Sequence, residues 1–119
     1  MNTAQTGARG EDAACTFLRK QGCQILARNW RRPCGEIDIV ALEGKTLVFA
    51  EVKTRASNAF GGPLAAVTAG KQRKIALAAH LFIKENAPKF DSIRFDVICL
   101  LDGKLTHIKN AFSPARGTL

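Results

Sequence analysis

Two carboxylates and one lysine in the middle of the chain have the types and spacing of a site for a divalent cation. Asp38 lies in the segment 35–42, and Glu51 and Lys53 lie in the segment 46–54. Carboxylate oxygens bind hard cations such as Mg²⁺. An ammonium group beside such an ion can orient water or stabilise negative charge that develops during a reaction. The chemistry requires that the chain bring these three side chains together.

The two segments predict a β-hairpin around Gly44-Lys45, because glycine at the first position of a two-residue turn suits a type II′ hairpin. Directly opposed residues of such a hairpin have Cβ atoms roughly 4.5–5.5 Å apart. The predicted pairs are Glu43–Thr46, Leu42–Leu47, Val40–Phe49, Asp38–Glu51 and Glu36–Lys53. The turn therefore brings the carboxylates of Asp38 and Glu51 together, with Lys53 on the same face.

Alternation along the hairpin predicts which of its faces are buried. One face carries only apolar side chains, those of Ile37, Ile39, Ala41, Val48, Ala50 and Val52. The opposite face is apolar near the turn and charged farther along. Since both faces are apolar near the turn, the two strands are predicted to be central in their sheet.

Two opposed carboxylates in a partly dry setting repel each other, and desolvation adds to the cost. A shared proton or a hard divalent cation would relieve this repulsion. The alternative is a structural charge network in which Lys53 and Arg55 balance Glu36 and Asp38. The residues alone leave both interpretations open.

The remaining elements predict a mixed α/β sheet in the order helix, three strands, helix, two strands. Helices are expected at 9–21 and 64–85, and the second one predicts a parallel crossover between its flanking strands. Further strands are expected at 23–27, 93–101 and 105–108, and loops at 28–33 and 55–63. We expect one domain over residues 1–119, with loose tails at 1–6 and 113–119.

The composition favours a soluble globular protein with a polyanionic partner. Hydrophobic residues make up 46% and charged residues 24%, and no apolar run reaches the length of a membrane span. The net charge is +8, which favours nucleic acid, although charge that only aids solubility is the alternative. No signal peptide is expected at the N-terminus, so cytoplasm is the expected location. The four cysteines form no C-x-x-C pair and are expected to be reduced thiols.

The segments 35–41, Gly-Glu-Ile-Asp-Ile-Val-Ala, and 49–55, Phe-Ala-Glu-Val-Lys-Thr-Arg, resemble the PD-(D/E)xK nuclease motif, with Ile37 in place of its proline. They are most similar to the YraN-like family of small bacterial proteins, which is itself similar to archaeal Holliday junction resolvases. The similarity extends to Gly10-Glu11, Arg28-Asn29, Phe60-Gly61, Lys71 and Arg94-Phe95-Asp96-Val97. The resemblance implies a restriction-endonuclease-like fold, a mixed central sheet flanked by helices.

The resemblance also implies hydrolysis of phosphodiester bonds in nucleic acid, DNA rather than RNA, including branched or junction DNA. Asp38 and Glu51 would hold Mg²⁺ or Mn²⁺, with Lys53 beside them. Glu11, on the inward stripe of the first helix, would assist metal binding; alternatively it is a first-turn acid favoured by the helix dipole. Glu36 would support Lys53. Junction resolvases act as symmetric pairs, so a homodimer is a further expectation.

Several basic residues are expected to contact the nucleic acid. Lys71 falls on the apolar stripe of the second helix, where a lysine is unexpected, and would reach the site or a phosphate. The other candidates are Arg28, Trp30, Arg31, Arg32, Arg55, Arg73 and Lys74, with Trp30 stacking on an unpaired base. The alternatives are a solvated basic face and a tryptophan in the core. Asp96 is expected to be structural.

Two other functions compete with a nuclease. One is a nucleic-acid-binding module that keeps the fold but does not cut. The other is a scaffold or adaptor subunit that binds acidic proteins through its basic surface.

Overall fold

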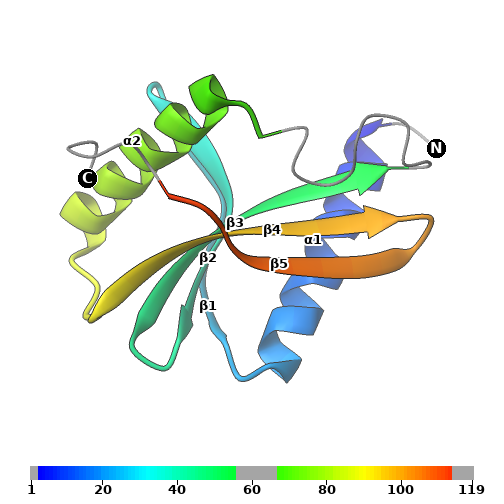
Figure 1. Cartoon of the computed structure of the whole chain (residues 1–119), viewed down its shortest axis with the longest axis horizontal. Helices are drawn as coiled ribbons and strands as arrows, with labels where there is room; N and C mark the ends of the chain where they lie inside the picture. The colour runs from blue at the N-terminus through cyan, green and yellow to red at the C-terminus, as the bar shows by residue number, and fades with distance from the viewer. Residues whose placement is uncertain (1–2, 56–66, 114–119) are drawn as a thin grey trace.

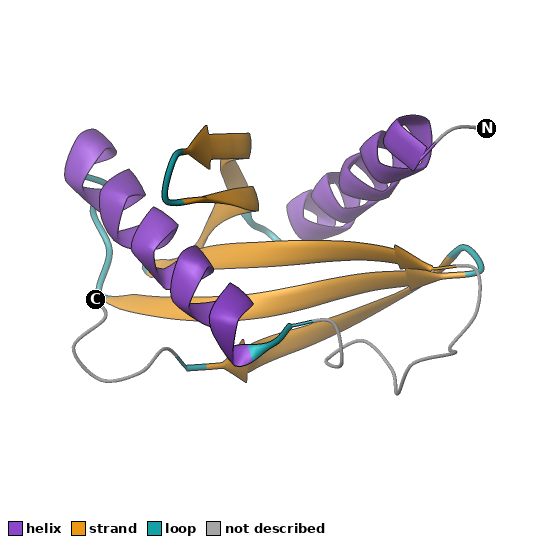
Figure 2. Ribbon diagram, turned by 90° about the horizontal axis from the view of Figure 1, so that it is seen from above, coloured by secondary structure: helices purple, strands orange, loops and turns teal. Residues whose placement is uncertain are grey.

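The computed structural model describes residues 3–55 and 67–113, which form a five-stranded mixed sheet with a helix on each face (Figures 1 and 2). The elements are α1 (Thr3–Lys20), β1 (Gln24–Arg32), β2 (Gly35–Glu43), β3 (Thr46–Arg55), α2 (Ala69–Asn86), β4 (Ser92–Leu101) and β5 (Lys104–Phe112). The strand order is β1-β2-β3-β4-β5, in which β3 and β4 are parallel and the other neighbours antiparallel. The predicted fold class, element order and parallel crossover are confirmed.

The β2–β3 hairpin has the predicted turn and register near its tip. Gly44 has a φ of +60°, and Lys45 is not among the residues with positive φ, as a type II′ turn requires. The pairs Glu43–Thr46, Leu42–Leu47 and Val40–Phe49 are all present. The pairing ends at Ile39–Ala50, so the ladder does not include the predicted pairs Asp38–Glu51 and Glu36–Lys53.

The first strand is longer than predicted, because β1 continues from Arg28 to Arg32, and Pro33 lies in the turn that follows. This stretch was predicted to be a loop on account of its charge. β1 is an edge strand of the sheet, and Arg28, Asn29, Arg31 and Arg32 are exposed on it. An edge strand that carries charge on its open side resembles a loop in composition, since such strands avoid apolar exposure.

The sheet changes its buried face at Asp38, and this overturns the predicted position of Ile37. Ile37 packs with Val40 in the core beneath α2, whereas Ile39 packs in the separate core beneath α1. Asn29, in the neighbouring strand β1, has a φ of +48°. A left-handed residue is unusual within a strand, and the pairing of β1 with β2 also shifts between Ile25 and Ala27. Asp38 therefore lies between the two faces of the sheet.

The ends of three elements differ from the prediction. Helix α1 begins at Thr3, so that residues 3–6, expected to be a tail, are helical. Helix α2 begins at Ala69, because Thr68 has an extended backbone and its side chain caps the helix by accepting a hydrogen bond from Lys71 N at 3.3 Å. Strand β5 extends to Phe112, past an irregularity in its pairing with β4. The predicted loop beyond residue 55, the helical stretch 64–66 and the tail beyond residue 113 lie outside the described residues.

The two cores account for most of the buried apolar side chains, and the hairpin contributes to both. The core beneath α2 includes Phe49, Phe82 and Phe95, and the core beneath α1 includes Leu18 and Ile98. Cys15, Cys23 and Cys99 are buried and Cys34 is half-buried, all as free thiols. No helix in the described ranges is long and apolar enough to cross a membrane.

Candidate functional site

Asp38 lies where β2 separates from β3, and acidic side chains approach it from both faces of the sheet. Its Oδ2 accepts a hydrogen bond from the backbone N–H of Val52 at 2.8 Å. Burial, and next the charge of Glu51, raise the pKa of Asp38 from its ordinary 3.8 to about 7. The charge of Glu11 also contributes to this rise, while the Val52 bond and Lys53 oppose it. Asp38 is thus a carboxylate whose negative charge is poorly compensated, a state that a cation would relieve.

Glu51 and Lys53 lie side by side on the α2 face of β3, as the hairpin predicted. Lys53 Nζ is 2.8 Å from Glu51 Oε1, and the two side chains are only 14% and 16% exposed. The predicted trio of Asp38, Glu51 and Lys53 is therefore brought together. Asp38 and Glu51 are not a direct cross-strand pair, however, because the β2–β3 ladder ends before them.

Glu11 approaches Asp38 from helix α1 and is buried, with 9% of its surface exposed. Its Oε2 accepts a hydrogen bond from Asn29 Nδ2 at 2.8 Å. Burial raises the pKa of Glu11 more than this bond lowers it. Because α1 begins at Thr3, Glu11 lies well past the first turn, and the helix dipole does not explain its position. The inward orientation expected of Glu11 is confirmed.

The close approach of α1 to the sheet depends on the residue before Glu11. A Cβ atom at Gly10 would collide with the hydroxyl oxygen of Thr54 on β3. A larger residue here would force the Thr54 side chain to shift, so Gly10 allows the close contact of helix and strand beside Glu11.

The described acids offer oxygen ligands for a divalent cation but do not form a closed metal site. Within residues 3–55 and 67–113, no group of three or more His, Cys, Asp or Glu side chains is placed to hold one ion. Asp38 and Glu51 offer the hard oxygen ligands that Mg²⁺ prefers. Mg²⁺ is commonly bound by one or two carboxylates together with water and substrate phosphates. The donor set is compatible with Mg²⁺ or Mn²⁺ in that open form.

A cavity of about 470 Å³ opens beside Glu51 and Lys53. The end of the β1–β2 hairpin forms one wall, and the first turns of α2 form the other. The lining residues are Arg31, Arg32, Gly35, Glu36, Glu51, Lys53, Lys71, Lys74 and Ile75. Five of these side chains are basic and two are acidic, so the cavity has a net positive charge. We call it the basic groove.

Gly35 and Lys71 shape the basic groove in ways that concern the site directly. A Cβ atom at Gly35 would lie 2.8 Å from the carbonyl oxygen of Lys74, so the hairpin end rests directly on α2. The charge of Lys53, followed by burial, lowers the pKa of Lys71. Lys71 is therefore close enough to Lys53 to reach the site, as its unexpected position on the helix predicted.

The other predicted nucleic-acid contacts are divided by the structure. Trp30 packs edge-on against Phe82, with ring centroids 5.5 Å apart, and so takes the alternative role of a core residue rather than an open stacking platform. The Arg32 guanidinium lies 4.2 Å over its ring and forms an ion pair with Glu85 at 2.7 Å. Glu36 pairs with Arg31 at 3.4 Å and not with Lys53.

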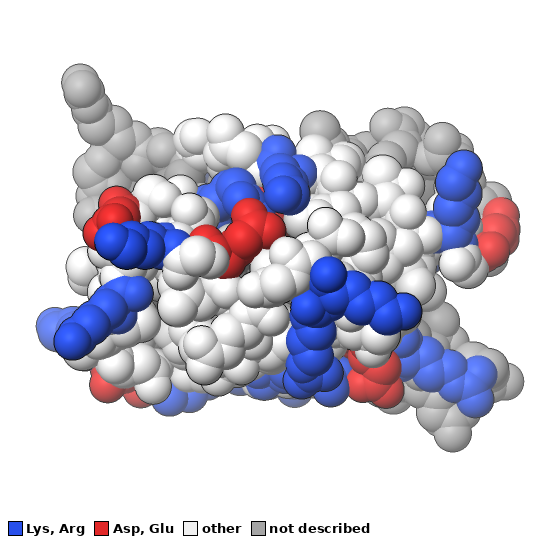
Figure 3. Space-filling view, turned by 90° about the horizontal axis from the view of Figure 1, so that it is seen from below, with Lys and Arg blue, Asp and Glu red and all other residues white. Residues whose placement is uncertain are grey.

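Three further candidates lie outside the lining of the basic groove. Arg28 pairs with Asp12 of α1, Arg55 donates to the carbonyl of Thr54, and Arg73 is exposed on α2. On the face seen from below, acidic side chains lie beside basic ones with much uncharged surface between them (Figure 3). The positive charge on that face is therefore interspersed rather than continuous.

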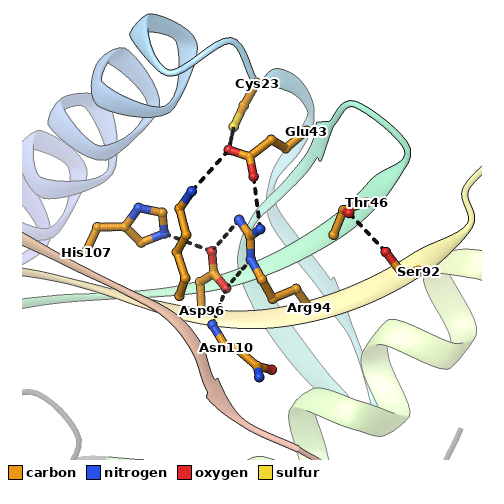
Figure 4. Close-up of polar contacts among 9 residues, drawn as sticks. Cys23, Glu43, Thr46, Ser92, Arg94, Asp96, His107 and Asn110 are labelled. Carbon is orange, nitrogen blue, oxygen red and sulfur yellow. Dashed lines mark hydrogen bonds and ion pairs between the residues drawn. The ribbon is translucent and has the colours of Figure 1, made fainter.

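A second polar cluster surrounds Asp96 on β4 (Figure 4). Asp96 is fully buried, and its oxygens lie 2.9 and 3.0 Å from Arg94 Nε and Nη2 and 2.8 Å from His107 Nε2. The backbone N–H of Asn110 donates to it at 2.9 Å. Burial favours the protonated form, but these hydrogen bonds outweigh it and lower the pKa of Asp96. These contacts tie β4 to β5, as expected of a structural residue.

Glu43 extends this cluster toward the end of α1. It accepts a hydrogen bond from Arg94 Nη1 at 2.9 Å, and Lys109 Nζ lies 3.6 Å from its other oxygen. The Cys23 thiol donates to Glu43 at 3.6 Å. Every charge in this cluster therefore has a partner of opposite sign or a hydrogen-bond donor.

Fold and site together define a class: mixed α/β proteins whose central hairpin holds an acid–lysine cluster at the side of a basic groove. The chain belongs to the family described as "Uncharacterised protein family UPF0102", whose model matches residues 10–100. This is the YraN-like family that its motifs resemble.

Bacterial relatives match nearly the whole chain. A UPF0102 protein of Geotalea daltonii is 47% identical over 114 residues, covering 92% of this chain and 90% of the relative. One of Geobacter metallireducens is 43% identical over 119 residues, covering 97% and 98%. One of Rhodococcus opacus is 42% identical over 111 residues, covering 89% and 94%.

Three features of the site were not predicted from the sequence. These are the left-handed backbone of Asn29, the hydrogen bond from Val52 N–H to Asp38, and the contact of Gly35 with Lys74. Only Gly35 gave a local signal, because a glycine in a strand often marks a close backbone approach.

Proposed function

We propose that this chain is a metal-dependent nuclease that hydrolyses phosphodiester bonds, in DNA more readily than in RNA. The observation that carries the proposal is the environment of Asp38. Its carboxyl group has a pKa raised to about 7 and lies within the field of Glu51, Glu11 and Lys53, beside a basic groove. Perturbed acids next to a charged cavity are typical of catalytic sites.

Asp38 and Glu51 would hold Mg²⁺ or Mn²⁺, which when bound would polarise the phosphate and lower the pKa of a coordinated water. The hydrogen bond from Val52 holds the Asp38 carboxylate in one orientation. Lys53, 2.8 Å from Glu51, would stabilise negative charge that develops on a phosphate oxygen. Glu11, fixed by Asn29, would increase the attraction for the cation.

A second candidate is a nucleic-acid-binding module that does not cut. The ion pair between Lys53 and Glu51 favours it, because Lys53 neutralises Glu51 without a metal ion. The same basic groove would then serve binding alone.

A cleavage panel separates the two candidates. End-labelled single-stranded, flapped, duplex and four-way junction DNA would be incubated with Mg²⁺ or Mn²⁺ and, separately, with EDTA. We expect metal-dependent cleavage that falls about 10³-fold in Asp38→Ala and Lys53→Ala. Asp91→Ala, an exposed acid on the α2–β4 connection, is the matched control and should cut at the native rate. Absence of cleavage on every DNA, with binding retained, would establish the module instead.

The homodimer that the resemblance suggests belongs to the same proposal. Two matched cuts in a four-way junction require two active sites related by symmetry. Light scattering of the protein with and without a junction would give the mass, and a monomer on the junction would contradict paired cleavage.

A further inference from the structure

Two of the cations that line the basic groove form no ion pair with a described residue. Arg31 is paired with Glu36, and Lys53 is paired with Glu51. Lys71 and Lys74 line the groove from α2, and neither forms an ion pair with any residue in the described part of the chain.

Lys71 lies in a position that is unfavourable for a cation. It occupies the first turn of α2, where the helix dipole is positive and where the helix has no acidic residue. It also lies beside the ammonium group of Lys53, whose charge is the main cause of its lowered pKa. Two neighbouring cations at a helix N-terminus are stabilised by an anion between them.

The dimensions of the groove select among anions. A volume of about 470 Å³ corresponds to a cube with an edge of about 8 Å. A DNA duplex is larger than this in cross-section, because its major groove alone is about 12 Å wide. The walls are held close, because Gly35 of the hairpin touches the backbone of α2 at Lys74. The cavity is therefore too small to enclose a duplex.

We infer that the basic groove binds the phosphate backbone of one unpaired nucleic-acid strand, with Lys71 and Lys74 as phosphate contacts. This inference rests on the proposed function and specifies its substrate: a nucleic acid with a single-stranded segment at the point of cleavage. A phosphate held by Lys71 would lie next to Lys53 and Glu51. Lys74 and Arg31, on opposite walls, would hold the next phosphates along the strand.

Binding measured without cleavage tests the inference. Fluorescence anisotropy in EDTA would compare a labelled 12-nucleotide single strand with the blunt duplex of the same sequence over a range of salt concentrations. The variants are Lys71→Ala/Lys74→Ala and, should that protein lose helix content by circular dichroism, Lys71→Gln/Lys74→Gln. The matched control is Lys89→Ala, an exposed lysine beyond the far end of α2.

For the native chain we expect the single strand to bind at least about tenfold more tightly than the duplex. Each phosphate contact to a single strand adds about 0.7 to the slope of log K against log salt. The double variant should therefore lose about 1.4 of that slope, while Lys89→Ala keeps the native slope.

Equal affinity for strand and duplex, or equal slopes in the double variant and the control, would overturn the inference. Since EDTA prevents metal-dependent cleavage, this result is independent of the cleavage panel. Selective strand binding without cleavage on any substrate would uphold the groove and reject the nuclease.

Discussion

Asp38 and Asp96 are both aspartates on strands of one sheet, but their surroundings shift their pKa values in opposite directions. Asp96 is surrounded by donors: the Arg94 guanidinium, His107 and the N–H of Asn110. Asp38 accepts one backbone hydrogen bond and lies in the field of two other acids. The pKa of Asp96 is lowered in consequence, whereas that of Asp38 is raised to about 7.

The difference indicates that Asp96 stabilises the fold and that Asp38 is suited to binding a ligand. A buried carboxylate with several donors loses little by leaving water, and it holds its strands in place. A carboxylate placed among like charges reduces stability, and such sites are characteristic of function. Replacing either acid by a neutral residue tests whether the two aspartates differ in this way.

The largest effect on stability is expected at Asp96. Asp96→Ala would leave Arg94 and His107 without their buried partner, and we expect a loss of about 3 kcal/mol in the free energy of unfolding. Urea denaturation at pH 7 measures it, with Asp91→Ala as control at under about 0.5 kcal/mol. Because the folded pKa of Asp96 is lowered, its contribution is complete above pH 3.8 and is lost as the pH falls through the folded value. An unchanged unfolding midpoint would contradict a structural role for Asp96.

At Asp38 we expect a substitution to increase the free energy of unfolding rather than to decrease it. Its folded pKa lies above the unfolded one, so the ionised carboxylate reduces stability progressively as the pH rises from about 4 to about 7. A shift of about three pKa units corresponds to at most about 4 kcal/mol. Solvent screening reduces this value, and we expect Asp38→Asn to be about 2 kcal/mol more stable than the native chain at pH 8 in EDTA. Asparagine keeps an acceptor for Val52.

Measurement at pH 3.5 is the control for Asp38→Asn, because Asp38 is then protonated in the folded chain and mostly protonated in the unfolded one, so the two proteins should unfold nearly alike. Added Mg²⁺ should stabilise the native chain at pH 8 and have little effect on the variant. A variant less stable than the native chain at pH 8 would mean that Asp38 is a structural acid like Asp96.

The smallest effect is expected at Glu43, which lies at the edge of the Asp96 cluster and is partly exposed. Glu43→Gln retains an acceptor for Arg94 but removes the charge that faces Arg94 and Lys109. We expect a loss of about 1 kcal/mol by urea denaturation and native binding to DNA. A loss as large as that of Asp96→Ala would show that the cluster acts as one unit.

The hairpin was predictable because its signals are local. Gly44 fixed the turn, and alternation placed Glu51 and Lys53 on one face with Phe49. The inward orientation of Glu11 followed from its helical stripe. These features depend on residues a few positions apart, for which backbone geometry leaves few choices.

The bend of the sheet was not predictable in this way. A left-handed Asn29 depends on β1 pairing with β2 and on the bond from Asn29 to Glu11, which lies 18 positions away. The reversal of Ile37 and the end of pairing beyond Ile39 occur at this bend. The strand character of residues 28–32 was hidden for a related reason, since an edge strand needs few apolar residues.

The sequence by itself determined the order of the elements, the hairpin register near its turn and the choice of acids and lysine. Only the tertiary structure decided that Asp38 would lie between two cores, within the field of Glu11 and Glu51 and at the side of a narrow groove. The physical reason is that burial and field at a carboxylate are sums over groups from several elements, and no local pattern of residues specifies such a sum.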